Sequence, residues 1–568
     1  MIFSIIAFIL LLLFPTAAHA IYDPRTVPNN PYGIHIIDTD DLGDARILVN
    51  SSGGDWGYVT LVIAESDRNI GKWQNAMNEM RRLHLIPIIR IATHVDNASW
   101  VVPQEIDADK WADFLNKLNW PTENRYVVLF NEPNHAKEWG NSLNPEEFAR
   151  ISVTYAKKLK EKSEDFFILP AGLDGSAPNG RETMDSSEYL RRMKSAVPEF
   201  FDVIDGWTSH AYPNPAFSGP ATAFGKGTIR GFIWERTFLH SLGVTKPYPI
   251  FITETGWQHS GGKLFNPSLP TPEDVANRIT MSSQSVWNDP DIVAITPFLL
   301  NYQDIPFDHF SFRKYLTKEY YPHFFAYQKI QKTDGKPKQH ESFTFLIPFL
   351  PSSLIVNSSY TLTGTLINNG QSIIDPTEGD ELIISDPTRT FTTLCTLSSS
   401  LEPTEQAEVS CAVRTPITEG TFDVAISKVN QGIIIPIQKR LIELVPPPTV
   451  EGSVRLGWKT ISTADDVTVL VFDLQNELIH KFTNLRIEKG KIQVSGLYHI
   501  VPDASYRVVI LVPYYLPRQI VTKLGKTRTT IHFDRLLPFD FDNDGALTVK
   551  DLSAWLFTKP HDTIARFF

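Results

Sequence analysis

The sequence is poor in cysteine, since only Cys395 and Cys411 occur among its 568 residues. So few thiols suggest neither thiol catalysis nor a cysteine-ligated metal site. In an exported protein the two would form one disulfide that closes a short loop, and two free buried thiols are the alternative. Neither pairing state points to a function, so the chemistry must be sought in other residue types.

Basic residues are also in short supply, because 53 Lys and Arg face 64 Asp and Glu, giving a formal net charge of -11. Nucleic acids and anionic membranes are bound by basic faces, which this composition does not favour. A chain with 42% hydrophobic and 11% aromatic residues is typical of globular proteins. Its length predicts three or four structural units.

Beyond its N-terminus the chain lacks an apolar run long enough to span a membrane, which takes about 20 residues. The N-terminal run from Ile5 to Phe14 is followed by Pro15 and by Ala18-His19-Ala20. This order is typical of an export signal with a small-residue cleavage site. We therefore expect residues 1–20 to be a signal peptide and the protein to be secreted or displayed at the cell surface. An uncleaved anchor is the alternative, because Met1 to Ser4 carries no Lys or Arg.

Between residues 21 and 335, short strand-like runs alternate with amphipathic helix-like stretches. Eight such strands with helical intervals predict a (β/α)8 TIM barrel. An open doubly wound sheet is the alternative, but no Gly-rich phosphate turn follows the first strand. The expected strands are 33–37, 58–63, 86–91, 126–130, 167–171, 203–207, 249–252 and 292–298. The expected helices are 70–83, 108–118, 145–162, 187–197, 229–242 and 272–288.

The pattern changes to short β-type runs near residue 340, with turn residues between them and no helical period. We expect a β-sandwich over 341–445 and a second small β domain over 451–533. Pro446-Pro447-Pro448 makes a stiff spacer between them. Both β domains are expected to be spacers or carbohydrate-binding modules, and spacers are favoured because no strip of aromatic residues is evident.

Two glutamates stand directly after apolar, strand-like runs. Glu132 follows the run 126–130 within Asn131-Glu132-Pro133-Asn134, and Glu254 follows the run 249–252. In a barrel of parallel strands the chemistry lies at the carboxyl ends of the strands. Retaining glycoside hydrolysis needs two carboxyl groups about 5–5.5 Å apart, one as proton donor and base and one as nucleophile. The pair therefore predicts a glycosidase site.

Asn-Glu-Pro after the fourth expected strand and a Glu after the seventh resemble clan A of the retaining glycoside hydrolases. This large group includes the family 5 cellulases and the family 39 xylosidases. The resemblance covers roughly residues 31–330 and implies that Glu132 is the acid/base and Glu254 the nucleophile. It also implies that Asn131 hydrogen-bonds the 2-hydroxyl of the sugar, a contact that strengthens in the transition state.

The same resemblance suggests three further polar residues of the site. His210 and Tyr212 in Ser209-His210-Ala211-Tyr212 match the clan's His-x-Tyr arrangement, in which the Tyr hydroxyl hydrogen-bonds the nucleophile. Arg90, near the end of the third expected strand, is a candidate for the cation that keeps the nucleophile ionised. The clan more often supplies that Arg from an earlier strand.

Aromatic residues at strand ends are expected to bind the faces of sugar rings, and Trp56, Trp257 and Tyr302 are the candidates. The clan commonly carries a Trp at the end of strand eight. Here the corresponding stretch, 296–302, reads Thr-Pro-Phe-Leu-Leu-Asn-Tyr and contains none. This departure leaves the residue at the floor of the sugar subsite open.

A twelve-residue acidic loop lies near the C-terminus, within the segment 536–568. Its carboxylates fall at positions 1, 3, 5 and 12 with Gly545 at position 6, the spacing of an EF-hand calcium loop. Together with the helix-like stretch after it, the loop resembles one dockerin calcium repeat, although only one repeat is evident. We expect a structural Ca²⁺ here, a cohesin-like partner being less favoured and a calcium-free acidic loop being the alternative. The expected ligands are Asp540, Asp542, Asp544, Ala546 (through its carbonyl), Thr548 and Asp551.

The sequence therefore predicts an exported, multidomain, retaining β-glycosidase that needs no cofactor for catalysis. Its substrate would be a poly- or oligosaccharide. A barrel that binds glycans without cleaving them is one alternative. A transglycosylase that uses the same residues is another.

Overall fold

The computed structural model describes residues 21–347, 351–430 and 432–557, so the expected signal peptide lies outside the described residues. The chain divides into two compact units, Met1–His340 and Glu341–Phe568. Within the described part of the chain, no helix is long and apolar enough to cross a membrane.

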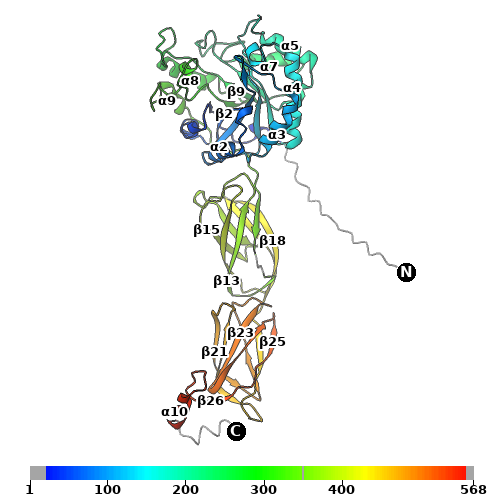
Figure 1. Ribbon diagram of the computed structural model, residues 1–568, viewed down its shortest axis with the longest axis vertical. Helices are drawn as coiled ribbons and strands as arrows, with labels where there is room; N and C mark the ends of the chain where they lie inside the picture. The colour runs from blue at the N-terminus through cyan, green and yellow to red at the C-terminus, as the bar shows by residue number, and fades with distance from the viewer. Residues whose placement is uncertain (1–20, 348–350, 431, 558–568) are drawn as a thin grey trace, which may run out of the picture. The chain divides into compact units, whose positions relative to one another are not determined.

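The first unit is an α/β barrel-like domain built on eight parallel strands (Figure 1). One sheet has the order β1-β2-β3-β6-β7 and the other the order β10-β9-β8. Parallel bridges from Tyr32 to Ile295 and from Asp174 to His210 join the two sheets at both sides, which an open doubly wound sheet would not show. The strands are β1 (Gly33–His35), β2 (Gly57–Ala64), β3 (Leu85–Ala92), β6 (Arg125–Leu129), β7 (Phe166–Pro170), β8 (Trp207–His210), β9 (Ile250–Glu254) and β10 (Ile292–Ile295).

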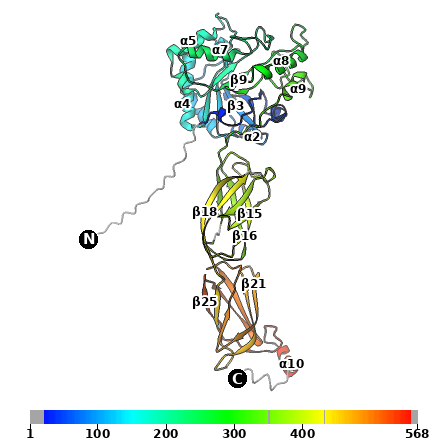
Figure 2. The same cartoon turned by 180° about the vertical axis from the view of Figure 1, so that it is seen from behind.

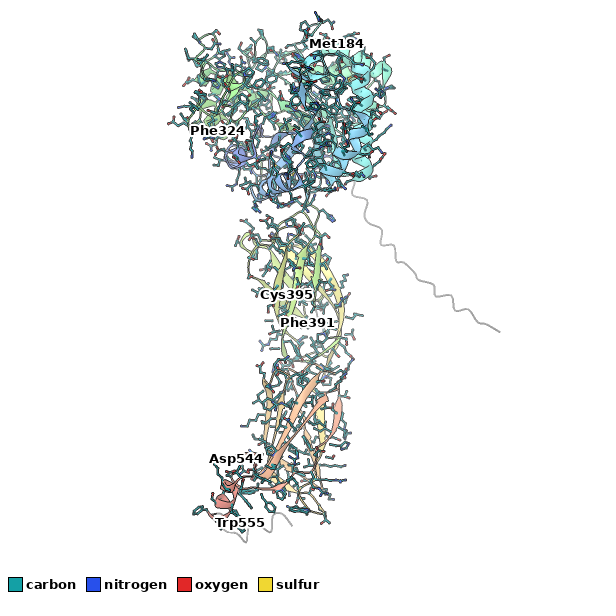
Figure 3. All side chains as sticks on the ribbon, viewed as in Figure 1. Met184, Phe324, Phe391, Cys395, Asp544 and Trp555 are labelled. Carbon is teal, nitrogen blue, oxygen red and sulfur yellow. A yellow bond between two sulfur atoms is a disulfide. The ribbon has the colours of Figure 1, made fainter. Side chains whose placement is uncertain are left out.

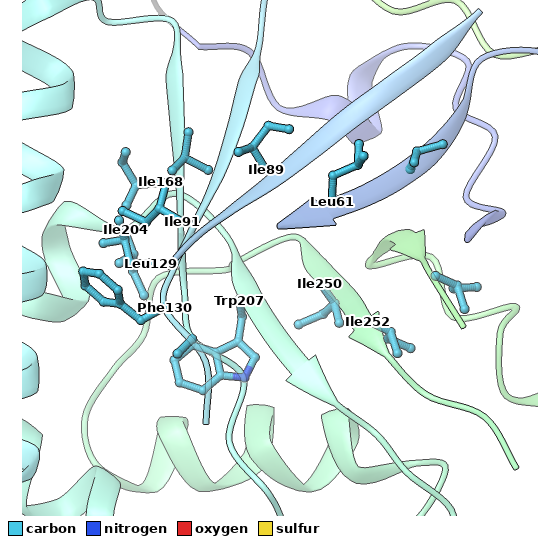
Figure 4. Close-up of a cluster of buried hydrophobic side chains, with 14 of the residues drawn as sticks. Leu61, Ile89, Ile91, Leu129, Phe130, Ile168, Ile204, Trp207, Ile250 and Ile252 are labelled. Atoms are coloured by element: carbon cyan, nitrogen blue, oxygen red, sulfur yellow. The ribbon is translucent and has the colours of Figure 1, made fainter. Parts of the chain in front are cut away.

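The strands are buried on both faces, because their side chains alternate between the barrel interior and the surrounding helices. The interior is filled by a cluster that includes Tyr58, Ile88, Tyr126 and Phe251. Residues of the opposite face form the larger core against the helices, part of which Figure 4 shows. It includes Leu61, Ile89, Ile91, Leu129, Ile168, Ile250 and Ile252.

Helices surround the strands, as the opposite views of Figures 1 and 2 show. Five of the six expected helices begin and end within two residues of the expected bounds, whereas α8 ends three residues early. The first unit has eight parallel strands, as expected. The expected strand 203–207 is wrong, because Phe200–Val203 is a short helix and β8 begins only at Trp207. The helices are α1 (Leu42–Val49), α2 (Ile70–Arg82), α3 (Ala108–Asn116), α4 (Pro145–Lys162), α5 (Ser186–Ala196), α6 (Phe200–Val203), α7 (Gly231–Ser241), α8 (Pro272–Ser285) and α9 (Pro322–Gln328).

The second unit is rich in β-strands and begins with an eight-stranded sheet of order β11-β13-β16-β15-β14-β17-β18-β12. Cys395 and Cys411 face each other directly in β15 and β16 and form a disulfide; Cys395 is labelled in Figure 3. The strands are β11 (Phe343–Leu346), β12 (Ser353–Ile355), β13 (Ser359–Asn368), β14 (Glu381–Ser385), β15 (Thr392–Leu397), β16 (Gln406–Arg414), β17 (Gly420–Asn430) and β18 (Ile433–Val445).

Two further sheets follow, of order β22-β19-β25 and β21-β20-β23-β24-β26, around a separate core. In each β domain a strand near the beginning pairs in parallel with a strand near the end: β12 with β18, and β19 with β25. The elements are β19 (Thr449–Ser453), β20 (Ala464–Phe472), β21 (Leu478–Ile487), β22 (Lys491–Val494), β23 (Ser505–Val512), β24 (Tyr514–Lys523), β25 (Arg528–His532), β26 (Pro538–Asp540) and the helix α10 (Val549–Phe557).

Candidate active site

The two glutamates lie at the same end of the barrel, beside His210. Glu254 is the last residue of β9, and Glu132 follows β6 by three residues. One ligating atom from each of Glu132, His210 and Glu254 lies within 4.8 Å of the others. The chain turns abruptly here, with φ of 70° at Phe130 and 27° at Glu132, a left-handed region that side chains disfavour. The structure thus brings together two carboxylates that are far apart in sequence.

Glu254 is buried and held by two donors. Arg90 Nη1 lies 2.5 Å from its Oε1, and the Tyr212 hydroxyl donates to its Oε2 over 3.0 Å. Burial acts to raise the pKa of Glu254, but the positive charges of His210 and Arg90 outweigh it and lower the pKa to about 2. The carboxylate is therefore ionised at neutral pH, as a nucleophile must be.

Glu132 is the more accessible of the pair, its side chain being 21% exposed against 9% for Glu254. His210 Nδ1 lies 2.9 Å from Glu132 Oε1. Burial acts to lower the pKa of His210, and the charges of Glu254 and Glu132 reverse this and raise it. Gly172 makes room for the imidazole, because a Cβ there would lie 2.1 Å from its Cδ2 atom. Glu132 thus contacts both solvent and the imidazole of His210.

Asn131 also takes part in this network. Arg90 Nη1 donates to Asn131 Oδ1 over 2.7 Å, while Asn131 Nδ2 donates to Glu138 Oε2 over 3.3 Å. One guanidinium thus holds both the Glu254 carboxylate and the neighbouring amide. Glu138 could not be identified from the sequence, because nothing in the spacing of the chain marks it.

His35 is a second residue that the sequence analysis missed. It ends β1, is fully buried, and its Nδ1 lies 3.9 Å from Glu254 Oε1. Neither ring nitrogen has a hydrogen-bond partner among the described residues. Burial lowers the pKa of His35 to about 3, so the ring is neutral beside the Glu254 carboxylate. Its position at the carboxyl end of the first strand was the one available signal.

Two of the three aromatic predictions are wrong. Trp56 precedes β2, so it lies at the amino end of the barrel, where it is buried and stacks on His84 with ring centroids 4.7 Å apart. Trp257 follows β9 at the correct end, but its ring is buried and its Nε1 donates to the Gly219 carbonyl. Neither ring face is therefore presented to a sugar.

The third aromatic candidate, Tyr302, is partly exposed, and its ring lies 5.5 Å from that of Phe307. Phe298 follows β10 and packs edge-on against His35, with ring centroids 5.1 Å apart. The aromatic surface beside the carboxylates is therefore built from Phe298, Tyr302 and Tyr212 with their phenylalanine neighbours.

The acidic loop of the second unit gathers three carboxylates. One oxygen from each of Asp540, Asp542 and Asp544 lies within 4.8 Å of the others. Asp540 is buried, and its Oδ1 has no hydrogen-bond partner among the described residues. An orphaned buried carboxylate oxygen beside two more carboxylates fits a hard cation such as Ca²⁺. Figure 3 labels Asp544 of this loop and Trp555 of the following helix.

The remaining predicted ligands hold the shape of this loop. The Asp551 carboxylate accepts from the backbone N–H groups of Phe541 and Thr548, over 2.9 and 2.6 Å. Ala546 donates its N–H to Asp544 Oδ1 over 2.9 Å. Asp551 therefore already closes the loop through backbone hydrogen bonds, while the other three aspartates face one another.

No protein-family model matches the sequence, and no curated protein matches it. Among solved structures, the chain is similar to a family 39 glycoside hydrolase from Bacteroides cellulosilyticus WH2, with 14% identity and a TM-score of 0.36 over 69% of this chain and 82% of that one. It is also similar to a β-mannanase from Thermomonospora fusca, with 12% identity and a TM-score of 0.34 over 53% and 90% of the two chains.

A third similar structure is an FMN-binding β-glucuronidase from Facaelibacterium prausnitzii L2-6, with 11% identity and a TM-score of 0.34. The match covers 74% of this chain and spans only 56% of that one. These identities and TM-scores are too low to establish a function. The fold therefore rests on the pairing of the strands, and the function rests on the side chains of the site.

Proposed function

We propose that the protein is an exported retaining β-glycosidase with a (β/α)8 barrel of the clan A type. The observation that carries the proposal is the grouping of Glu132, His210 and Glu254 within 4.8 Å at the carboxyl ends of the strands. Carboxyl groups this close leave no room for a water between nucleophile and sugar, which favours double displacement over inversion.

The two carboxylates have environments that suit different roles. Glu254, ionised and held by Arg90 and Tyr212, attacks the anomeric carbon and forms a glycosyl-enzyme ester. Glu132 donates its proton to the departing glycosidic oxygen. In the second step Glu132 removes a proton from water, which attacks the anomeric carbon and releases Glu254. No cofactor is needed for either step.

The test is the hydrolysis of β-glucan, mannan, xylan, galactan and small aryl β-glycosides by the purified mature protein. Glu132→Ala and Glu254→Ala are run alongside, with Glu79→Ala as a control because Glu79 is an exposed carboxylate in α2 that pairs with Arg82. We expect both site variants to lose turnover and the control to keep it. Full activity of Glu254→Ala, or release of the α-anomer as seen by proton NMR, would refute the mechanism.

The same purified protein can be used to distinguish the two alternative functions, transglycosylation and glycan binding. A transglycosylase would transfer the sugar to an added acceptor in preference to water, which analysis of products with and without acceptor detects. A folded protein that cleaves no member of the panel but retains glycans on an array would be a binding protein. The pairing of Arg90 and Tyr212 with Glu254 favours catalysis, because binding alone does not need an ionised buried carboxylate.

We also propose that the loop from Asp540 to Asp551 binds a structural Ca²⁺ and forms a single dockerin-like repeat. The orphaned Oδ1 of Asp540 supports this assignment. Native mass spectrometry should show one Ca²⁺ per chain that Asp540→Asn removes and Asp534→Asn, an exposed residue before the loop, does not. A cohesin-like partner would then bind only the calcium-loaded protein.

For export, we propose cleavage after Ala20. Sequencing the N-terminus of protein recovered from the culture medium should find Ile21 first. Retention of residues 1–20 in a membrane fraction would indicate the uncleaved anchor instead.

A further inference from the structure

The amide of Asn131 is held at both ends by groups of opposite hydrogen-bonding character. Its Oδ1 accepts from Arg90 Nη1 over 2.7 Å, and its Nδ2 donates to Glu138 Oε2 over 3.3 Å. A guanidinium can only donate and an ionised carboxylate can only accept. Turning the amide over would place oxygen against carboxylate and NH₂ against guanidinium. Only one orientation of the amide therefore satisfies both neighbours.

That orientation determines what Asn131 can offer to a substrate. Its Nδ2 carries two hydrogens, of which Glu138 takes one. The other remains as a donor, whereas the amide oxygen is already engaged by Arg90. Asn131 is thus set to donate to a sugar hydroxyl oxygen at the reacting ring.

Glu138 is itself held in place by the loop that carries it. It ends the short 3-10 helix Ala136–Glu138, and its N–H donates to the His135 carbonyl over 3.0 Å. The neighbouring Lys137 carbonyl accepts from Ser99 Oγ over 2.8 Å, and the Gly140 N–H donates to the Trp100 carbonyl over 2.8 Å. The hairpin of β4 (Val95–Asp96) and β5 (Ser99–Trp100) therefore clamps this helix.

A cavity of about 40 Å³ adjoins this network, with Thr93, Trp100, Arg90, Asn131, Glu138 and Trp139 among its lining residues. This space can hold a water molecule but not a sugar ring. Its size agrees with Glu138 acting through Asn131 and not by direct contact with a substrate.

We propose that Glu138 is a positioning residue that fixes the Asn131 amide, so that Nδ2 donates to the 2-hydroxyl oxygen of a β-glycoside. The proposal rests on the proposed glycosidase function. It adds the reason why the activity of the enzyme would depend on the 2-hydroxyl group. Glu138 acts through Asn131 and does not touch the reacting atoms.

The test compares an aryl β-glycoside with its 2-deoxy analogue in the full-length protein. Glu138→Leu removes the acceptor, whereas Glu138→Gln keeps an amide oxygen at the same distance along the side chain. Glu147→Gln is the matched control, because Glu147 accepts from Trp139, the residue next to Glu138, and has no contact with Asn131.

With the parent glycoside we expect Glu138→Leu to lower kcat/KM about tenfold, the scale of one lost hydrogen bond, chiefly through kcat. Glu138→Gln should stay within about threefold of wild type, and Glu147→Gln should match wild type. With the 2-deoxy substrate, Glu138→Leu and wild type should have equal kcat/KM, because the hydroxyl that the amide serves is missing.

The other outcomes each overturn something definite. Equal losses on both substrates would mean that Glu138 only supports the fold, and no loss on the parent would mean that it does not orient Asn131. If Glu138→Leu does not fold, kcat/KM of Glu138→Gln is compared on the parent and the 2-deoxy substrate instead. A loss of kcat/KM that persists on the 2-deoxy substrate would then refute the proposal. An inactive wild type would instead refute the proposed glycosidase function.

Discussion

Arg90 offers the sharpest test of how this site keeps its nucleophile ionised. The guanidinium donates to Glu254 Oε1 and Asn131 Oδ1 at once, over 2.5 and 2.7 Å. Arg90→Met would keep most of the buried stem while removing the charge and both hydrogen bonds. His210 would remain as the second positive neighbour of Glu254. The substitution therefore isolates the part of the pKa shift that Arg90 supplies.

The expected size follows from the environment of Glu254. A hydrogen bond to a charged group contributes about 1.5–3 kcal/mol, and one pKa unit corresponds to about 1.4 kcal/mol. The side chain of Glu254 is only 9% exposed, so water screens the pair weakly. Removing Arg90 should therefore raise the pKa of Glu254 by about one to two units above its value of about 2.

The assay is the pH dependence of kcat/KM, which reports the free enzyme. Glu254 attacks only when ionised, so activity falls as the pH drops through its pKa. The acidic limb of the wild type should lie at or below pH 3, and that of Arg90→Met should move upward by one to two units. Arg90→Lys should fall between them, because one ammonium keeps the charge without the planar fork.

A matched substitution, Arg191→Met, should leave the profile unchanged, since the exposed Arg191 of α5 contacts Glu188 and the ring of Phe238 and no residue of the site. An acidic limb of Arg90→Met at the wild-type position would refute the electrostatic role given to Arg90. Loss of activity at every pH with an unmoved limb would show that Arg90 acts through positioning alone.

Three further outcomes are expected. Calcium at one hundred times its dissociation constant should stabilise the second unit by about 2.7 kcal/mol, seen in calorimetry as a higher melting temperature. Asp540→Asn should abolish this gain, and an equal response of both proteins would contradict the calcium assignment. Replacing Cys395 and Cys411 together by Ser should lower the free energy of unfolding in urea by about 3 kcal/mol, and an unchanged midpoint would show that the bridge adds nothing. Gly172→Ala should push the ring of His210 away from its carboxylate partner and reduce kcat at least tenfold, whereas wild-type turnover would mean that the ring has another place to go.

The helices were the most predictable part of the fold, because their boundaries are written in local residue types. Helix α4 begins and ends at the expected residues, Pro145 and Lys162. Asn144 caps it by accepting from the Glu147 N–H, and Pro145 occupies the first turn, where no N–H is needed.

The presence of eight parallel strands could be anticipated from the sequence, but the exact start of β8 could not. The apolar residues before it, Phe200, Phe201 and Ile204, are buried by a short helix and the turn after it. A short apolar run is compatible with either a strand or a buried helical turn, so the pattern does not decide between them.

Within the site, the residues found from sequence are those that end a strand or closely follow one inside a recognisable sequence motif. Glu132, Asn131 and His210 belong to this group. Glu138 reaches the site only through the fold of the loop after β6, which no local pattern encodes. The Trp56 prediction failed because a residue beside a strand lies at the catalytic end only if it follows that strand, and Trp56 precedes β2.

The parallel pairs β12–β18 and β19–β25 have a mechanical consequence. When a chain is pulled from its two ends, strands near the beginning and end of a domain that run in parallel slide past each other. Their hydrogen bonds, evenly spaced along the ladder, then share the load and must break together instead of one after another. Each of these two ladders is therefore expected to resist a force that pulls on the two ends of its own β domain.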